Sequence, residues 1–235
     1  MIRKFLALFL VLHLTACAEL QQVVNQLPQT GGVLNTTDMA AGLRQALDFG
    51  IEKQVTKLTQ TDGFYKNELV KILLPEELKK VDKGLRDIGL GRLADEGIKA
   101  LNRAAEDAVK EATPIFVDAV KGITFADAKT ILLGNDDAAT QYLNSKTQTA
   151  LYSKFNPVIK NSFAKVGADT VWKNLITKYN AIPFTTDVNP DLTDYVTSEA
   201  LKGVYTMIAV EEKDIRNNFA ARTTDLLQKV FALQD

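Results

Sequence analysis

Apolar residues recur every three or four positions along most of the chain, which is the spacing of one face of an α-helix. The pattern is clearest from Ile98 to Ala119, where steps of three and four continue over three heptads. The alanines in this stretch predict a seam that a neighbouring helix approaches closely. Alternation with period two is nowhere long enough for a sheet. The pattern therefore predicts an all-α fold of about eight or nine helices.

Turn-forming residues divide this pattern into separate helices. Pro114 is expected to kink the helix through 98–119, because proline removes the hydrogen bond to the carbonyl of Lys110. Pro157 is expected to end one helix at Phe155 and to start the next. Another helix is expected at Leu43–Leu58, with a cap at Thr37 or Asp38 and an end at Asp62-Gly63. After an extended piece at Val70–Leu74, the next helix is expected to run from Pro75 to a break at Gly89 and Gly91. The remaining expected helices are Phe125–Leu133, one capped by Asp136 or Asp137, one containing Val171–Tyr179, Leu192–Ile215 and Asp225–Leu233.

The N-terminus differs in composition from the rest of the chain. Arg3 and Lys4 precede the apolar run Phe5–Leu14, which is too short to span a bilayer and is typical of a secretory leader. The sequence Leu14-Thr15-Ala16-Cys17 resembles the lipobox of bacterial lipoproteins, in which cleavage precedes an acylated Cys. We therefore expect residues 1–16 to be a lipoprotein signal peptide and Cys17 to carry the lipid.

The next segment, residues 17–36, is rich in Gln, Asn, Thr and Gly and has no sustained apolar period. It is predicted to be a flexible tether with a reach of roughly 25 Å. Ala18, rather than Asp, follows the Cys, which by resemblance to Gram-negative sorting rules indicates the periplasmic face of the outer membrane. No linker inside 37–235 is long enough to separate two domains, so one compact helical domain is expected. The sequence leaves open whether the tether packs on this domain.

Composition and charge exclude several classes of function. The chain has 235 residues, 46% of them hydrophobic and 24% charged, and a formal charge of −1, which argues against a dedicated nucleic-acid binder. Removal of residues 1–16 would leave 26 basic and 29 acidic residues, or −3, and would take away His13, the only His. A mature chain without imidazole or free thiol has no Ser-His-Asp triad, Cys nucleophile or His-based metal site. We expect no cofactor and no metal.

Two motifs have simpler structural explanations. The letters from Gly89 to Ala94 match a dinucleotide fingerprint, but a charged amphipathic helix precedes them where that fingerprint needs a strand. Asp187, Asn189 and Asp191 occupy the first, third and fifth positions of a calcium loop, whose sixth position should be Gly and is Leu192. A helix-turn-helix and a helix start with Pro at the first position are the preferred interpretations.

Polar residues beside the apolar faces are the remaining candidates for a site. Asn102, Arg103 and Glu106 flank the alanine-rich seam, where they either fix helix register or line a pocket; register is our interpretation. The charge run 211–216 is interpreted as a solvated helix face. Asp136 and Asp137 are interpreted as caps rather than as a catalytic carboxylate pair. The candidate polar residues are Asn102, Arg103, Glu106, Asp136, Asp137, Arg216 and Arg222.

The aromatic residues fall mostly on the predicted apolar faces. Core packing is the default interpretation, and a pocket for an apolar ligand is the alternative. The residues concerned are Phe116, Phe125, Tyr142, Phe155, Phe163, Trp172, Tyr179, Tyr195 and Tyr205.

Six segments, distributed over nearly all of 37–235, together resemble an uncharacterised bacterial lipoprotein family (domain of unknown function 4197). They are residues 62–65, 101–106, 124–128, 134–140, 211–216 and 221–227. Leu73 and Phe219 stand where the resemblance leads us to expect Pro, which concerns local turn geometry. The resemblance supplies no reaction.

We therefore expect a non-catalytic binding or structural module of the cell envelope, held at the membrane by N-terminal acyl chains. Its partner would be an envelope protein or an apolar ligand, and its oligomeric state stays open. The alternative is a carboxylate-dependent hydrolase of cell-wall glycan, because carboxylates are the hydrolytic groups left to such a chain. Helical lytic enzymes resemble one another in a Glu-Ser pair at the catalytic acid, and this chain contains no Glu-Ser dipeptide.

Overall fold

A computed structural model describes residues 36–87, 89, 91–165, 170, 172–173, 176–177, 180, 187 and 191–232. These residues contain eight α-helices, one 3₁₀ turn and no strand, which confirms the all-α prediction. The expected signal peptide 1–16, the tether as far as residue 35, and residues 181–186 and 188–190, between the helices expected at Val171–Tyr179 and Leu192–Ile215, lie outside the described residues. The elements are α3 Thr36–Thr59, α4 Glu76–Asp87, α5 Gly91–Val109, α6 Ala112–Lys121, α7 Phe125–Leu132, α8 Ala138–Lys165, α10 Thr193–Asn217, η1 Phe219–Ala221 and α11 Asp225–Phe231.

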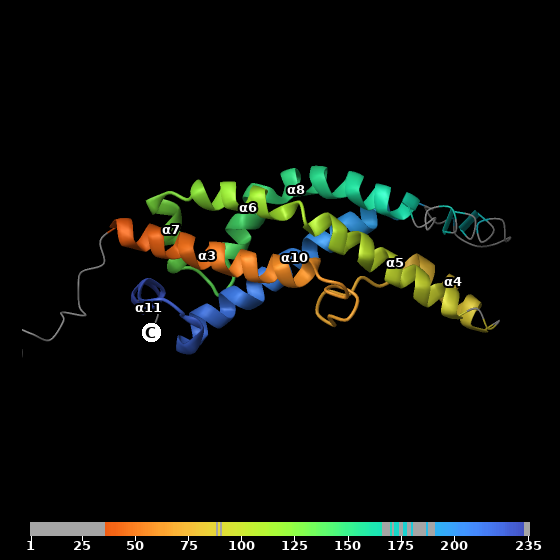
Figure 1. The fold of residues 1–235 in the computed structure, drawn as a ribbon, viewed down its shortest axis with the longest axis horizontal. Coiled ribbons are helices and arrows are strands. Elements are labelled where there is room, and N and C mark those ends of the chain that lie inside the picture. The colour runs from red at the N-terminus through yellow and green to blue at the C-terminus, as the bar shows by residue number, and fades with distance from the viewer. Residues whose placement is uncertain are drawn as a thin grey trace, which may run out of the picture. The chain divides into compact units, whose positions relative to one another are not determined.

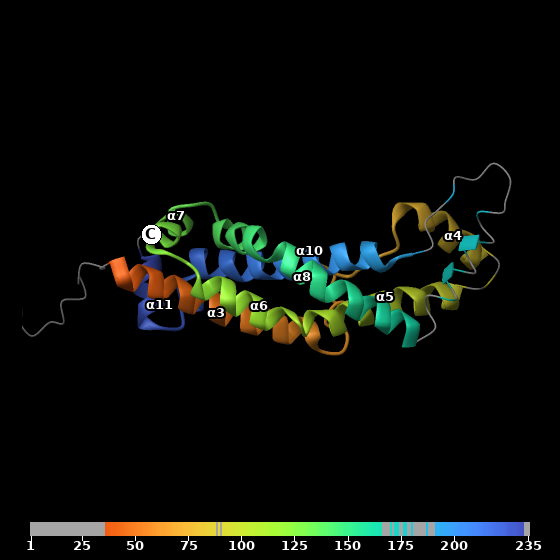
Figure 2. The same cartoon turned by 90° about the horizontal axis from the view of Figure 1, so that it is seen from above.

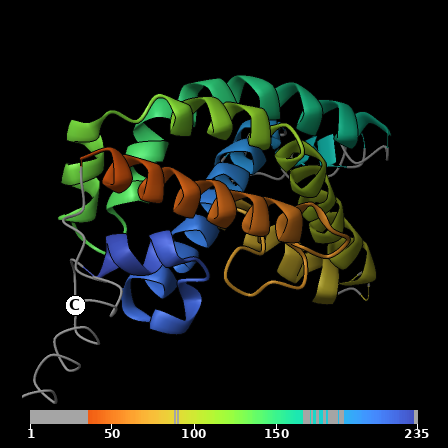
Figure 3. The ribbon, with the colours of Figure 1, turned by 60° about the vertical axis from the view of Figure 1, so that its left-hand side comes forward.

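Two long helices, α8 and α10, lie antiparallel beside one another (Figures 1 and 2). The hydroxyl groups of Thr147 and Tyr205 are hydrogen bonded at 2.8 Å where these helices meet. Helix α5 packs against α8 and also contacts α10. Helix α3 crosses α10 and also contacts α6, α7 and α11 (Figure 3). Residues 36–235 form one compact unit. None of the described helices is both long and apolar enough to cross a membrane.

The core follows the periodicity of the sequence. The apolar face of α3 is at most 5% exposed at Leu43, Leu47, Ile51, Val55 and Leu58. The predicted seam is fully buried on α5 at Leu101, Ala105 and Ala108, which allows α8 to pack closely. Helix α3 begins at Thr36, so Asp38 lies in the first turn rather than at the cap.

The prediction of one kinked helix through 98–119 is wrong. Helix α5 ends at Val109, Lys110 and Glu111 form a turn, and α6 begins at Ala112. Pro114 therefore lies in the first turn of α6, where its missing N–H has no intrahelical partner to lose. The break at Gly89 and Gly91 is confirmed, and Gly89 has φ +80, in the left-handed region.

The prediction that Pro157 separates two helices is also wrong, because α8 is continuous through it. Phe155, Ile159 and Phe163 are all buried on one face of α8, spaced four residues apart on both sides of the proline. Burial of each such side chain contributes about 2 kcal/mol, which together exceeds the roughly 3 kcal/mol cost of an interior proline.

Candidate functional site

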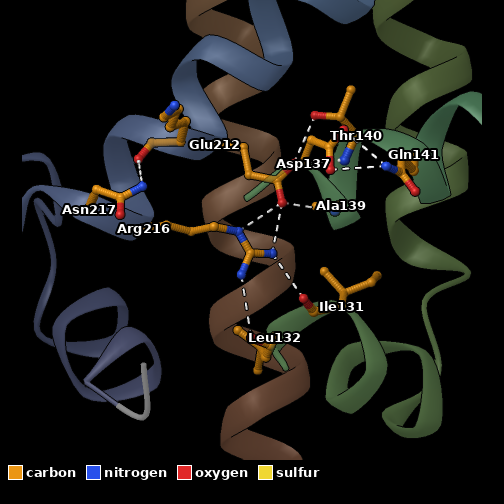
Figure 4. A network of polar contacts seen from close by, with 10 residues as sticks. Ile131, Leu132, Asp137, Ala139, Thr140, Gln141, Glu212, Arg216 and Asn217 are labelled. Atoms are coloured by element: carbon orange, nitrogen blue, oxygen red, sulfur yellow. Dashed lines mark hydrogen bonds and ion pairs between the residues drawn. The ribbon is translucent and has the colours of Figure 1, made fainter. Parts of the chain in front are cut away.

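Glu212 and Arg216, one turn apart on α10, hold the connection between α7 and α8 (Figure 4). We call this pair the α10 clamp. Glu212 Oε1 accepts hydrogen bonds from the Ala139 backbone N–H at 2.9 Å and from Arg216 Nη2 at 2.7 Å. Glu212 Oε2 accepts from the backbone N–H and the hydroxyl of Thr140, both at 2.8 Å. Arg216 in turn donates to the carbonyl oxygen of Ile131 at 2.9 Å.

The α10 clamp matches the dipoles of both helix ends that it contacts. A carboxylate at the N-terminus of α8 faces the positive end of that helix, and a guanidinium at the C-terminus of α7 faces the negative end of the other. Glu212 and Arg216 are 7% and 6% exposed, so both contacts are made away from water. The clamp therefore fixes the angle at which the chain leaves α7 and enters α8.

Arg222 caps the C-terminus of α10. Its guanidinium donates to the carbonyl oxygens of Ile215 at 3.1 Å and Arg216 at 2.9 Å, and the residue is 2% exposed. These carbonyls lie in the last turn of the helix, which leaves its final carbonyls without intrahelical partners. Arg222 thus connects the α10 clamp to η1 and α11.

Glu211 lies beside the clamp and pairs with α3. It accepts hydrogen bonds from Lys53 Nζ at 2.6 Å and Gln54 Nε2 at 2.7 Å. A cavity of about 20 Å³ between α3 and α10 is lined by Gly50, Glu211, Glu212 and Arg216 among mostly apolar residues. That volume suits about one water molecule. The interpretation of residues 211–216 as a solvated face is therefore wrong for Glu211, Glu212 and Arg216, which pack between helices.

A second clamp comes from α5, where Asn102 is fully buried. Its Oδ1 accepts a hydrogen bond from the Ile72 backbone N–H, and its Nδ2 donates to the Ile72 carbonyl oxygen, both at 2.8 Å. The amide thus pairs with Ile72 as a neighbouring β-strand would. Tyr195 donates from its hydroxyl to the next carbonyl, Leu73 O, at 2.9 Å. The predicted extended piece around Val70–Leu74 is held in this way without a sheet.

Glu106 completes the α5 clamp, which we define as Asn102 and Glu106. Glu106 Oε1 accepts from the Phe64 backbone N–H at 3.1 Å, and Oε2 pairs with Arg103 Nη1 at 2.5 Å. Arg103 also pairs with Asp62. A hydrogen bond from Lys66, together with the charge of Arg103, holds the pKa of Asp62 below its usual value. The sequence-based interpretation was that these α5 residues fix the register between helices. Their contacts with Phe64 and Ile72 instead hold the 62–74 loop against α5.

Asp136 and Asp137 are not joined to either clamp. Asp136 is exposed, and Asp137 accepts hydrogen bonds from Gln141 Nε2. The backbone N–H groups at the start of α8 go instead to Glu212 from α10. The expected local cap is therefore replaced by a carboxylate more than 70 positions further along the chain.

Five of the seven candidate residues thus form two groups rather than one site, and Asp136 and Asp137 belong to neither. Asn102, Arg103 and Glu106 meet on α5, and Arg216 and Arg222 meet at the end of α10. Sequence reasoning missed Glu212, whose carboxylate accepts hydrogen bonds from Ala139, Thr140 and Arg216. The available signal was the i, i+4 spacing of Glu212 and Arg216, which also occurs in exposed helix pairs.

The two motifs set aside on sequence grounds are only partly covered by the described residues. Gly89 lies in the predicted turn between α4 and α5, and Gly91 is the first residue of α5. Of the calcium-like loop, only Asp187 and Asp191 are described, and Asp191 Oδ1 accepts from the Thr193 backbone N–H at 2.9 Å. Among the described residues, no group of three or more His, Cys, Asp or Glu is placed to hold a metal ion.

Fold and contacts together define an all-α domain whose buried polar side chains hold connections between helices. The model of the family described as "Protein of unknown function (DUF4197)" matches residues 33–232. The chain therefore belongs to this family, in agreement with the resemblance of its sequence segments. Neither a curated protein nor a solved structure gives a significant match.

Proposed function

We propose that this protein is a lipid-anchored lipoprotein on the periplasmic face of the outer membrane and that its domain is a non-catalytic binding or structural module. The anchor is supported by the sequence Leu14-Thr15-Ala16-Cys17 after a basic and apolar leader. A lipoprotein N-terminus with three acyl chains exceeds the two signals that stable attachment requires.

The observation that carries the non-catalytic role is the use made of the buried carboxylates. Among the described residues these are Glu106, Glu211 and Glu212, and each accepts hydrogen bonds from a different segment of the chain. A general acid or base must instead reach substrate within hydrogen-bond distance. Contacts of this kind support a rigid scaffold that presents surfaces.

Geometry gives less support to the glycan hydrolase. Glycosidases place two carboxyl groups about 5–9.5 Å apart. Glu96 and Asp107 line one cavity of about 270 Å³, but they are eleven positions apart on α5, or about 16 Å along the helix axis. Glu211 and Glu212 adjoin only the cavity of about 20 Å³, which has no room for a sugar ring.

Two experiments test the proposal. A Cys17→Ser chain should remain unprocessed and should take up no labelled fatty acid, whereas the natural chain is labelled; equal labelling of both would refute the anchor. For the domain, a zymogram on purified cell wall should show no clearing. Clearing by the natural chain that is lost in Glu96→Gln or Asp107→Asn would establish the hydrolase instead.

A further inference from the structure

A cavity of about 690 Å³ lies between the C-terminal part of α8 and the start of α10. It is larger than the other three cavities described here and falls within the roughly 300–1,000 Å³ typical of small-molecule pockets. The described residues that line it are Lys160, Asn161, Phe163, Ala164, Thr170, Trp172, Lys173, Asp191, Leu192 and Thr193.

The inner wall of this cavity is apolar. Phe163, Trp172 and Leu192 contribute to it and are 5%, 5% and 6% exposed. Trp172 packs directly on α5, since a Cβ placed on Gly97 would lie 2.4 Å from Trp172 Cζ2. The missing side chain at Gly97 thus lets the indole ring rest against the α5 backbone and form a fixed apolar surface.

The outer wall carries more positive than negative charge. Lys160 and Lys173 are exposed there, and Asp191 is the single carboxylate among the described lining residues, which gives 2 − 1 = +1. Asp191 is engaged by the Thr193 backbone N–H. Exposed ammonium groups above an apolar wall attract an anionic group and disfavour a cationic one.

We propose that this cavity binds an anionic amphiphile, with its acyl chain against Phe163, Trp172 and Leu192 and its charged group near Lys160 and Lys173. Burial of the acyl chain supplies most of the affinity, because each methylene removed from water adds to it, and the lysines select the charge. This inference rests on the binding role proposed above and names its ligand class.

The other cavities have less suitable walls for such a ligand. A groove of about 360 Å³ between α8 and α10 is lined mainly by hydroxyl and amide side chains, including Asn144, Gln148 and Thr206. The cavity of about 270 Å³ between α5 and α8 is lined mostly by charged residues. Neither combines a buried aromatic wall with a net positive opening.

Trp172 is the only tryptophan of the chain, so its fluorescence reports on this cavity alone. We would express the chain from Ala18 onward, because residues 36–235 form a compact unit and binding is then tested without the anchor. Oleate and 1-oleoyl lysophosphatidate are titrated below their micelle concentrations, with uncharged monoolein as the matched ligand. We expect a saturable change in emission with one anion per chain, confirmed by native mass spectrometry.

Charge-removing variants locate the site. Lys160→Met combined with Lys173→Met should weaken binding of both anions about five- to tenfold and leave monoolein unchanged. Lys154→Met combined with Lys213→Met changes two exposed lysines on α8 and α10 that do not line the cavity, and should have no effect. Ala164→Phe, which narrows the cavity, should weaken all three ligands.

Several results would overturn the proposal. They are the absence of a saturable signal with both anions, equal affinity for monoolein and the anions, or equal losses in the two double-lysine variants. Tighter binding of one anion than of the other, with the lysine effect intact, would support the proposal and identify the headgroup. Failure here would leave the Cys17→Ser labelling result untouched, so the anchor and the ligand are tested separately.

Discussion

Glu212 and Arg216 are paired on α10 at 2.7 Å. The Glu212 carboxylate also binds the start of α8, and the Arg216 guanidinium also binds the end of α7. The contribution of this pair to stability therefore comes mainly from its contacts with α7 and α8. A buried ion pair by itself is weak evidence of stability, since the cost of desolvation offsets the attraction. Here each charge also satisfies backbone groups that would otherwise be buried without partners.

Glu212→Gln should lower the free energy of unfolding by about 3 kcal/mol, because it leaves the Arg216 charge buried without a counterion. Chemical denaturation followed by circular dichroism measures the loss. The matched control is Asp214→Asn, an exposed carboxylate two residues later, which should change stability by at most about 0.5 kcal/mol. Similar losses in both variants would mean that Glu212 has no special role.

Asn102→Leu keeps the branched shape and the number of side-chain heavy atoms but leaves the Ile72 N–H and carbonyl unpaired in the core. We expect a loss of about 3 kcal/mol. Hydrogen exchange should show faster exchange of the Ile72 amide than of amides in α8, because the 62–74 loop would open first. The exposed Asn217→Leu serves as the control. An Ile72 amide as protected as in the natural chain would contradict the α5 clamp.

Gly97→Ala should destabilise the domain by about 1–3 kcal/mol, because the new methyl group would overlap the Trp172 indole. The emission of Trp172 should shift as the ring is displaced. Gly84→Ala is the opposite case, since nothing lies within 4 Å of its Cβ position on α4. There the better helix propensity should stabilise by about 0.5–1 kcal/mol. A stabilising Gly97→Ala would show that the close contact is absent in solution.

Asp127 should contribute an acid-dependent part of the stability. The hydroxyl and then the backbone N–H of Thr124 donate to its carboxylate and lower its pKa below the ordinary value of 3.8. A lowered folded-state pKa gives stability that is present above about pH 4 and is lost as pH falls through that pKa. Asp127→Asn should therefore be less stable than the natural chain at pH 6, with a smaller difference at pH 3. A difference that grows towards pH 3 would contradict this sign.

The helices were predictable because their apolar spacing is local information. The apolar positions of α3 from Leu43 to Leu58, and Ala105 and Ala108 on α5, are buried as their spacing indicates. The exceptions depend on distant partners. The position of Pro157 in the sequence predicts a helix end there. Helix α8 continues past it because Phe155 and Phe163, on either side, are buried against other helices.

The candidate site was predictable only in part, for the same reason. Polar residues next to the alanine seam, such as Asn102, are placed beside a packed face by the helix period itself. Glu212 belongs to a run of charged residues whose composition is typical of an exposed helix face. Its burial depends on where α3 and α8 lie against α10. The backbone N–H groups of Ala139 and Thr140, which donate hydrogen bonds to Glu212, are 73 and 72 positions away in the sequence.

The distance along the chain between the α10 clamp and its targets has a consequence for biogenesis. The contacts that hold the α7–α8 turn can form only after Glu212 and Arg216 have been synthesised, more than 70 residues later. The C-terminus of α10 is capped only once Arg222 has also been added. Contacts between such remote positions form slowly, because a long loop must close first. During synthesis from the N-terminus, the α7–α8 turn and the end of α10 should therefore remain unfolded until almost the whole chain has been made. In that interval the chain would depend on chaperones to avoid aggregation.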